Sequence, residues 1–476
     1  MNKIRELFGI DLRALGVFRI LFALLFLCDQ VVRLSDLRVL YTDYGVLPRV
    51  ACLETYWDPW IFSVHLASGS LVAQAFLFVV AILAGFALLV GYRTSLAAFL
   101  SWFMILCEDA RNPMVLGEGV FIRLFLFWAM FLPLGERYSI DRVFRRTQER
   151  ENTQFLSMAT LSFLLQVALV YACAGFHKLR YDGWREGWAV FNSLAYDPLT
   201  KPLGYWLMQF HRVTWVLNYL VIGTEVGGAL LLFSPFFTPV IRLVMVFALI
   251  ALQLGFALCL ELGPLPWSMI TATVLFLPSA FWDVFFPKAS FSPPAPAQIK
   301  SLGKIFGYLK AFLKEACVSF VLVYVLLSNW ASFFPHPVPP WMQRVGGSVL
   351  WMDQFWTMFA PAPRSGGWNV IEGRQNNGRS IDLLNHGKPL SWQKPALISH
   401  TFKSQLWRKY WMRLLNTGFE IPRAAYASYL CRDWNEHHPN PEEKLKELEI
   451  FQMQTELLPH YQITVPRKIS YGKYSC

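Results

Sequence analysis

Residues 155–188 read FLSMATLSFLLQVALVYACAGFHKLRYDGWREGW, an apolar run of helix length that ends near the cationic Lys178. The hydrocarbon core of a bilayer takes roughly 20 such residues to cross. A lysine at the water boundary of a membrane helix is partly desolvated, which changes its chemistry. The segment therefore predicts a membrane helix whose last turn carries a candidate functional amine.

The composition of the whole chain indicates the same class. Hydrophobic residues make up 55% of the 476 residues and charged residues 16%, and the mean hydropathy is +0.36. We therefore expect a mainly α, polytopic helical membrane protein whose partner is the lipid bilayer. About nine stretches have the length of a transmembrane helix. They lie near 14–34, 71–91, 94–109, 118–135, 155–177, 214–233, 239–260, 265–283 and 315–335.

The distribution of Lys and Arg predicts the orientation, because these residues resist translocation across the membrane. The N-terminus, the loop after the fourth stretch and the segment 284–314 are all basic and are expected in the cytoplasm. The loop and segment carry Arg137, Arg142, Arg145, Arg146, Arg150, Lys288, Lys300, Lys304, Lys310 and Lys314. Nine spans then place the C-terminal part outside the cytoplasm, in a protein of the cell (inner) membrane. The net charge of +11 is attributed to topology and lipid contact. No nucleic-acid-binding motif is present.

Four parts are expected along the chain. They are a transmembrane domain over 1–283, a Pro- and Lys-rich cytoplasmic linker over 284–314, the ninth transmembrane helix over 315–335, and a small mixed α/β extracytoplasmic domain over 336–476. The composition changes from apolar to polar at the last boundary. This change places the mixed domain outside the membrane.

Local patterns predict the elements of the C-terminal domain. Residues 368–372 and 380–383 are expected to be strands on either side of an Asn-Asn-Gly turn at 376–378. Helical spacing of apolar residues predicts helices over 423–435 and 442–458.

The cysteines outside the predicted spans allow one disulfide. Cys52, Cys431 and Cys476 lie on the predicted outer side, where disulfides persist. The sequence does not choose among the three pairs. The run CRDWNEHH from Cys431 also holds two histidines, but its spacing matches no standard zinc pattern, and no metal site is expected.

Charged residues inside the predicted spans are costly in hydrocarbon unless paired or hydrated. They are Arg19, Asp29, Glu108, Asp109, Arg111, Arg123, Glu225 and Glu261. One interpretation is that they pair to fix helix packing. The other is that they line one polar cavity in which Glu225 faces Lys178.

The end of the helix at Lys178 has the same two interpretations. Lys178 either extends to the lipid headgroups or faces the cavity. Neighbours on a helix point about 100° apart, so at most one of His177 and Lys178 faces a cavity. Trp184, with Tyr181 and Trp188, suits an interfacial aromatic belt or a ligand-binding box.

Several motifs carry a resemblance to a known family. They are VYACAGFHKL at 170–179 with WREG at 184–187, VGYRTS at 90–95, RYSIDR at 137–142, and the helix around Glu225. Together they resemble the vitamin K-dependent γ-carboxylase family. More broadly, roughly residues 10–285 are similar to bacterial proteins with the horizontally transferred transmembrane (HTTM) domain. The tail from FAPAPRSGGW at 359 resembles the C-terminal region of those proteins.

The resemblance implies a cofactor and a base. Lys178 corresponds to the amine that starts oxygenation of vitamin K hydroquinone, a step that requires a neutral amine. The expected cofactor is a reduced quinone, such as vitamin K or menaquinone hydroquinone. Glu225 corresponds to an acidic position that orients a polar ligand group. Glu225, Gln253, Trp184 and Asn112 are the expected binding residues.

Two departures from the family argue against peptide carboxylation. The stretch ARNPMVLGEG from Ala110, which holds Asn112, lacks a histidine that the family has there. Gln253 stands where the family has another histidine, and an amide cannot shuttle protons at neutral pH.

Three classes of function follow. The first, which we favour, is a quinol-oxidising or carboxylase-like membrane enzyme with Lys178 as its base. The second is a non-enzymatic quinone or lipid binder, or an assembly factor, whose C-terminal domain holds a peptide or protein partner. The third is a transporter, which is weakest because no inverted repeat is apparent.

Overall fold

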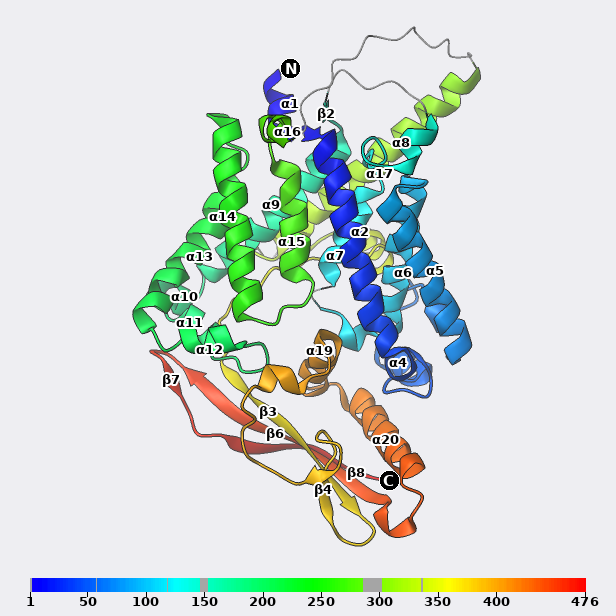
Figure 1. The fold of residues 1–476 in the computed structure, drawn as a ribbon, viewed down its shortest axis with the longest axis vertical. Helices are drawn as coiled ribbons and strands as arrows, with labels where there is room; N and C mark the ends of the chain where they lie inside the picture. The colour runs from blue at the N-terminus through cyan, green and yellow to red at the C-terminus, as the bar shows by residue number, and fades with distance from the viewer. Residues whose placement is uncertain (1, 57, 118, 146–152, 286–301, 335–336) are drawn as a thin grey trace.

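The computed structural model describes residues 2–56, 58–117, 119–145, 153–285, 302–334 and 337–476. Long helices form the upper body, and a sheet domain lies at the end opposite the N-terminus (Figure 1). Six helices of the described chain are long and apolar enough to cross a membrane. They are α2 (Leu12–Ser35), α5 (Leu71–Val90), α9 (Met158–Lys178), α13 (His211–Leu231), α14 (Thr238–Cys259) and α17 (Leu302–Ala331). The chain is a multi-pass helical membrane protein.

The nine predicted spans are not confirmed. α15 (Leu265–Thr273), extended by a 3-10 turn to Phe276, and α16 (Ser279–Phe285) are bent by 95° at the break between them, and they make a seventh span only if counted together. α6 (Thr94–Arg111) ends in a turn with three charged residues. α7 (Val120–Ala129) is only ten residues long. The apolar runs of the sequence therefore include helices that pack inside the body without the length or apolarity of a full span.

A core of aromatic side chains holds the long helices together. The ring centroids of Phe18 and Phe22 on α2 are 5.0 Å apart, and Phe163 of α9 meets Phe125 of α7 at 5.3 Å. A two-stranded sheet of β1 (Ile10–Asp11) and β2 (Gln154–Phe155) ties the start of α2 to the start of α9. The N-terminal ends of these two central helices are thereby held side by side.

Short helices complete the ends of the body. They are α1 (Asn2–Phe8), α3 (Leu37–Tyr41), α4 (Arg49–Tyr56), α8 (Ile140–Arg145), α10 (Asp182–Glu186), α11 (Ala189–Leu194), α12 (Pro202–Leu207) and α18 (Pro340–Met342). α10, α11 and α12 form the lower rim between α9 and α13, directly above the sheet domain (Figure 1).

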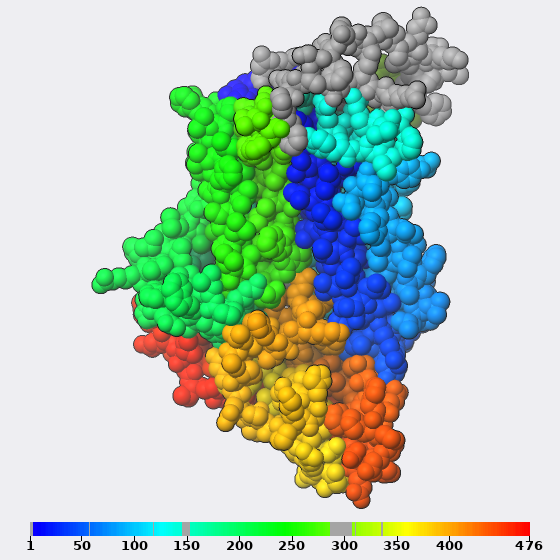
Figure 2. Space-filling model, in the orientation of Figure 1, coloured from blue at the N-terminus to red at the C-terminus, as the bar shows by residue number. Residues whose placement is uncertain are grey.

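The C-terminal domain is an antiparallel sheet with two helices, which confirms the mixed α/β prediction. The strands follow the order β5-β4-β3-β6-β7, and β8 also pairs with β6. Their bounds are β3 (Ser365–Gln375), β4 (Ser380–Asp382), β5 (Lys388–Pro389), β6 (Leu445–Leu458), β7 (Gln462–Ile463) and β8 (Arg467–Ser475), with helices α19 (Gln405–Leu414) and α20 (Glu420–His437). The domain packs closely against the lower end of the body (Figure 2).

Local predictions in this domain are right with one exception. The strands at 368–372 and 380–383, the turn between them and the helix at 423–435 are confirmed. The helix predicted over 442–458 is wrong, because this segment is strand β6. β6 pairs with β3 on one side and with β8 on the other. Backbone pairing with distant segments outweighs the helical spacing of its apolar residues.

One disulfide is present among the described residues, and the structure identifies its pair. Cys431 on α20 is bonded to Cys476 after β8, with 5.3 Å between their Cα atoms. Cys52 is a buried free thiol whose sulfur contacts the carbonyl of Arg111. The bridge fastens the end of the chain to the helix that covers the sheet.

Part of the sequence analysis lies outside the described residues. This applies to Arg146, Arg150, Lys288, Lys300 and most of the linker predicted over 284–314. The predicted domain boundaries stay predictions.

Candidate functional site

Lys178 is the last residue of α9 and is buried, with 2% of its surface exposed. α9 begins with a capping box formed by Ser157 and Thr160, which fixes the register of the helix. Val170, Ala174 and Lys178 then follow at four-residue intervals and line one cavity. Lys178 does not extend to solvent.

Glu225 on α13 faces Lys178, as the second interpretation predicted. The Lys178 amine donates hydrogen bonds to both carboxylate oxygens of Glu225, each at 2.8 Å. The two helices approach closely at Gly175, where a Cβ atom would lie 2.6 Å from Cγ2 of Val226. This glycine, one turn before Lys178, lets the buried pair form across the interface of α9 and α13.

The pair opens onto a cavity of about 330 Å³. Its polar lining adds Tyr171, Gln253, Thr357 and Lys409 to the pair, and its walls combine aromatic and aliphatic side chains. The Gln253 amide nitrogen donates to the Tyr171 hydroxyl at 3.2 Å. Oε1 of Gln253 is buried and accepts no hydrogen bond within the described chain. A buried acceptor without a donor is costly, so the cavity is suited to a ligand that carries an O–H or N–H group.

His177 points elsewhere, as helix geometry predicted. Its Nε2 lies 3.0 Å from the Ser332 hydroxyl of α17, and its ring stacks on Phe333. Only Lys178 of these two neighbours faces the cavity.

Trp184 lies behind the pair and does not line the cavity. Its indole nitrogen donates to the carbonyl of Phe359 at 2.6 Å, and Nζ of Lys178 lies 5.2 Å from the centroid of its ring. Trp184 is 2% exposed, so it belongs to no interfacial belt. Its position suits a cation–π contact that supports the amine.

Asn112 is separate from the cavity. It caps the C-terminal end of α6, and its amide donates to the carbonyl of Leu40 at 2.7 Å. The structure therefore brings Lys178, Glu225 and Gln253 together, with Trp184 beside them and Asn112 elsewhere.

A segment that the sequence analysis missed closes the cavity. Residues 351–359, here called the strap, run between α7, α9 and α17 before the sheet begins. Phe355, Trp356, Thr357 and Met358 of the strap line the cavity, and Trp356 stacks on Phe121 of α7 at 5.0 Å. The aromatic run FWTMF at 355–359 was the available signal.

The expectation of one cavity for all intramembrane charges is wrong. Arg33 of α2 contacts Asp29 at 2.6 Å and Asp109 at 3.1 Å, and Arg123 of α7 contacts Asp109 as well. None of these residues lines the Lys178 cavity. Their pairing agrees with the packing interpretation, because it joins α2, α6 and α7.

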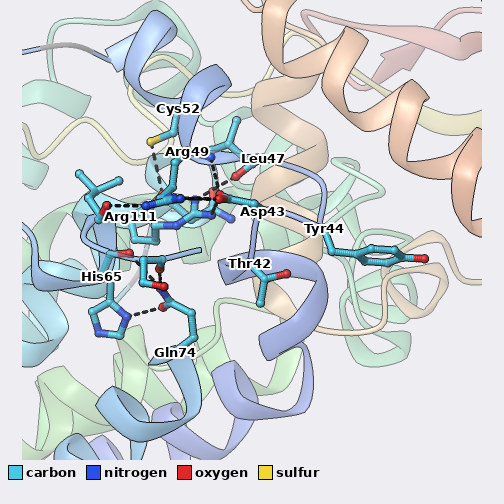
Figure 3. Close-up of polar contacts among 12 residues, drawn as sticks. Thr42, Asp43, Tyr44, Leu47, Arg49, Cys52, His65, Gln74 and Arg111 are labelled. Atoms are coloured by element: carbon cyan, nitrogen blue, oxygen red, sulfur yellow. Dashed lines mark hydrogen bonds and ion pairs between the residues drawn. The ribbon is translucent and has the colours of Figure 1, made fainter. Parts of the chain in front are cut away.

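A third polar group lies beside this network (Figure 3). Arg111 donates to the carbonyl of Leu47 at 2.9 Å, and Asp43 pairs with Arg49 at 2.8 Å. Partial burial acts to raise the pKa of Asp43, but hydrogen bonds from Arg49 outweigh it and lower that pKa. His65 and Gln74 face each other, with 2.7 Å between Nδ1 and Oε1. Burial lowers the pKa of His65 to about 4.

No group of three or more metal-ligating side chains converges within the described residues. His437 and His438 each contact a backbone carbonyl of their own helix.

Fold and site together define a multi-pass membrane protein with a buried Lys–Glu pair at a partly open cavity. The family model of the HTTM domain matches residues 9–282, and the chain belongs to the HTTM domain family. The match includes Lys178, Glu225 and Gln253, and it ends before the strap. No curated protein and no solved structure is significantly similar to the chain.

Proposed function

We propose that the cavity beside Lys178 binds a reduced quinone and that the protein is a quinol-oxidising membrane enzyme. The observation that carries this proposal is the buried Lys178–Glu225 pair on an aromatic cavity that also holds the unpaired Oε1 of Gln253. A hydroquinone has a flat ring for the aromatic walls. Its hydroxyl groups donate hydrogen bonds, one of which would satisfy Gln253.

In this proposal the ion pair takes up the first proton. One hydroxyl proton of the quinol passes to the Lys178–Glu225 pair, which changes from neutral to singly positive. The quinolate that forms is balanced by that positive charge at close range, where the low dielectric of the site strengthens the attraction. The base is therefore the pair, and Glu225 is as important as Lys178.

The resemblance to the carboxylase family supports dioxygen as the oxidant. Hydroquinone and O₂ then give the quinone epoxide and water, with atoms and electrons in balance. We do not propose carboxylation, because Gln253 and the stretch around Asn112 lack the histidines of that family.

A non-enzymatic quinone- or lipid-binding protein is the second candidate. The amine of Lys178 donates a hydrogen bond to each carboxylate oxygen of Glu225. Such a contact suits a structural ion pair as well as a base. In this case the C-terminal domain would hold a peptide or protein partner, as an assembly factor does.

The test is turnover of a quinol by purified protein. Wild type, Lys178→Ala and Glu225→Gln are incubated with menaquinone hydroquinone under oxygen, and epoxide is measured by chromatography. We expect epoxide from wild type and a loss of about 100-fold or more in both variants, as is usual when a general base is removed. Lys201→Ala is the matched control, because it removes a lysine from a more exposed pair with Glu261 and should retain activity.

The alternatives predict different results. Quinone that co-purifies or raises the thermal midpoint without epoxide formation would establish the binding protein. Folded wild type that neither binds nor oxidises the quinol would exclude both candidates for this ligand.

We further propose that the protein lies in the cell (inner) membrane with a cytoplasmic N-terminus and an extracytoplasmic C-terminal domain. Arg137 and Arg142 lie in the segment between α7 and α9. Their positive charges support a cytoplasmic position for this segment. The disulfide in the C-terminal domain supports an oxidising compartment for the other end.

A further inference from the structure

A second cavity, of about 240 Å³, lies within the C-terminal domain. Its floor is one face of β3 and β6, and Trp411 of α19 and Asn416 of the turn after α19 cover it from the side. Tyr196, from the loop after α11, closes the side toward the membrane body. Asn416 is exposed, so the cavity is accessible from solvent.

The polar lining of this cavity consists mainly of amide side chains. Asn369, Gln452 and Gln454 project from the sheet, and Asn416 comes from the turn that follows α19. Within the described chain, the side chains of Asn416 and Gln454 make no hydrogen bond, and Oδ1 of Asn369 is buried without a donor. Gln452 uses only its Oε1, which accepts from the Tyr471 hydroxyl at 3.1 Å. Each amide offers a donor and an acceptor, so the cavity presents both kinds of group in one small space.

The charge of the lining limits the class of ligand. No charged side chain lines the cavity among the described residues. A charged ligand would lose its hydration there without gaining an opposite charge, which is unfavourable. The ligand is therefore uncharged and carries several groups that both donate and accept hydrogen bonds.

The walls add flat apolar surfaces. Tyr196, Phe402 and Trp411 surround the amide groups. The cavity has a volume of about 240 Å³. This is the size of one small ring with its substituents, and not of an extended chain.

We infer that this cavity is a binding site for a single uncharged sugar ring, either free or at the end of a glycan. The hydroxyl groups of a sugar each donate and accept, which matches the unpaired amides. The C–H faces of the ring would pack against the aromatic walls. This inference does not depend on the quinol proposal, because it concerns a different domain and different residues.

A peptide fits this cavity less well. Sheets recognise peptides mainly through the free backbone groups of an edge strand. Here β3 and β6 pair with each other from Ser365 to Gln375, so the backbone groups between these strands are already used. On the cavity floor, between these two strands, the free hydrogen-bonding groups belong to side chains instead.

The experiment is ligand-observed saturation-transfer NMR on the full-length protein in detergent. The probes are glucose, galactose, mannose and N-acetylglucosamine, each free and as the terminal residue of a linear trisaccharide, with N-acetylglycinamide as the peptide probe. We expect saturation transfer to at least one sugar. Equal affinity for the free and terminal forms would assign a free-sugar site, and tighter binding of the trisaccharide would assign a glycan.

Two variants test whether the sugar binds in this cavity. Gln454→Leu keeps the size of the side chain and removes its hydrogen bonds, so affinity should fall about tenfold. Gln462→Leu makes the same change on β7, outside the cavity, and should leave affinity unchanged. Both variants should retain the Cys431–Cys476 disulfide and the thermal midpoint of wild type. The inference is overturned if no sugar receives saturation, if only N-acetylglycinamide does, or if both variants bind as wild type does.

Discussion

At the scale of single residues, His65 makes the stability of the protein depend on pH. It is fully buried, and burial lowers its pKa from 6.5 to about 4, with the charges of Arg111 and Arg33 acting in the same direction. Between these two pH values the unfolded chain binds a proton that the folded protein does not. The contribution of His65 to stability is therefore complete above pH 6.5, falls as the pH decreases toward 4, and changes no further below that.

The expected loss is about 3 kcal/mol between pH 7 and pH 4, from a shift of about 2.5 units at 1.36 kcal/mol each. The measurement is the thermal midpoint of detergent-solubilised protein over this range. His65→Gln should flatten the profile, whereas His437→Gln, at an exposed position, should leave it unchanged. An identical profile in His65→Gln and wild type would show that other groups cause the dependence.

The candidate residues differ in how far the sequence could predict them. Lys178 and Glu225 are polar residues in apolar helices, and the family resemblance singled them out before any contact was known. Gln166 and Gln354 form an equally buried pair, but they are 188 residues apart and belong to no motif. No local pattern predicts such a contact, because it depends on how the strap crosses α9.

At the scale of elements, the strap is held by this amide pair. Gln166 of α9 and Gln354 of the strap exchange two hydrogen bonds, of 2.9 and 2.7 Å. Asn329 of α17 donates to the same Oε1 of Gln354 at 3.1 Å. The pair thus fastens the segment that closes the Lys178 cavity to two membrane helices.

Gln166→Leu would leave the amide of Gln354 buried without its main partner. We expect this variant to destabilise the protein by about 1–3 kcal/mol, and Gln354→Leu to do likewise. The double variant should cost less than the sum, because neither amide is then left alone. A double-mutant cycle on unfolding in detergent measures the coupling. Additive losses would mean that the two amides do not interact in solution.

Elements that depend on local signals were predicted well, and β6 was not. Ile450 and Phe451 are neighbours in β6 and both are buried, on opposite faces of the sheet. Coverage of both faces removes the alternation by which a strand is recognised. The partners of β6 are the separate segments 365–375 and 467–475, which a local window does not include.

At the scale of the whole molecule, the membrane body and the C-terminal domain form one closely packed unit. The strap reaches into the body, while Tyr44, after α3, donates to Glu436 of α20 at 2.6 Å. The Lys178 cavity lies where the two parts meet, since α9 and α13 supply its pair and the strap supplies its cover. A ligand in this cavity would therefore contact residues of both parts.

The two ends of the molecule are expected to lie on opposite sides of the membrane. Helix α1, which contains Lys3, lies at the end of the body away from the C-terminal sheet (Figure 1). Asn377 lies in the exposed turn after β3, within the C-terminal domain. In intact cells, a membrane-impermeant maleimide should label Asn377→Cys, and it should label Lys3→Cys only after the membrane is opened. The bridged Cys431 and Cys476 should react only after reduction, because their thiols are absent while the bond exists. Labelling of Lys3→Cys alone in intact cells would reverse the orientation. It would also place the disulfide in the reducing compartment, where such bonds rarely persist.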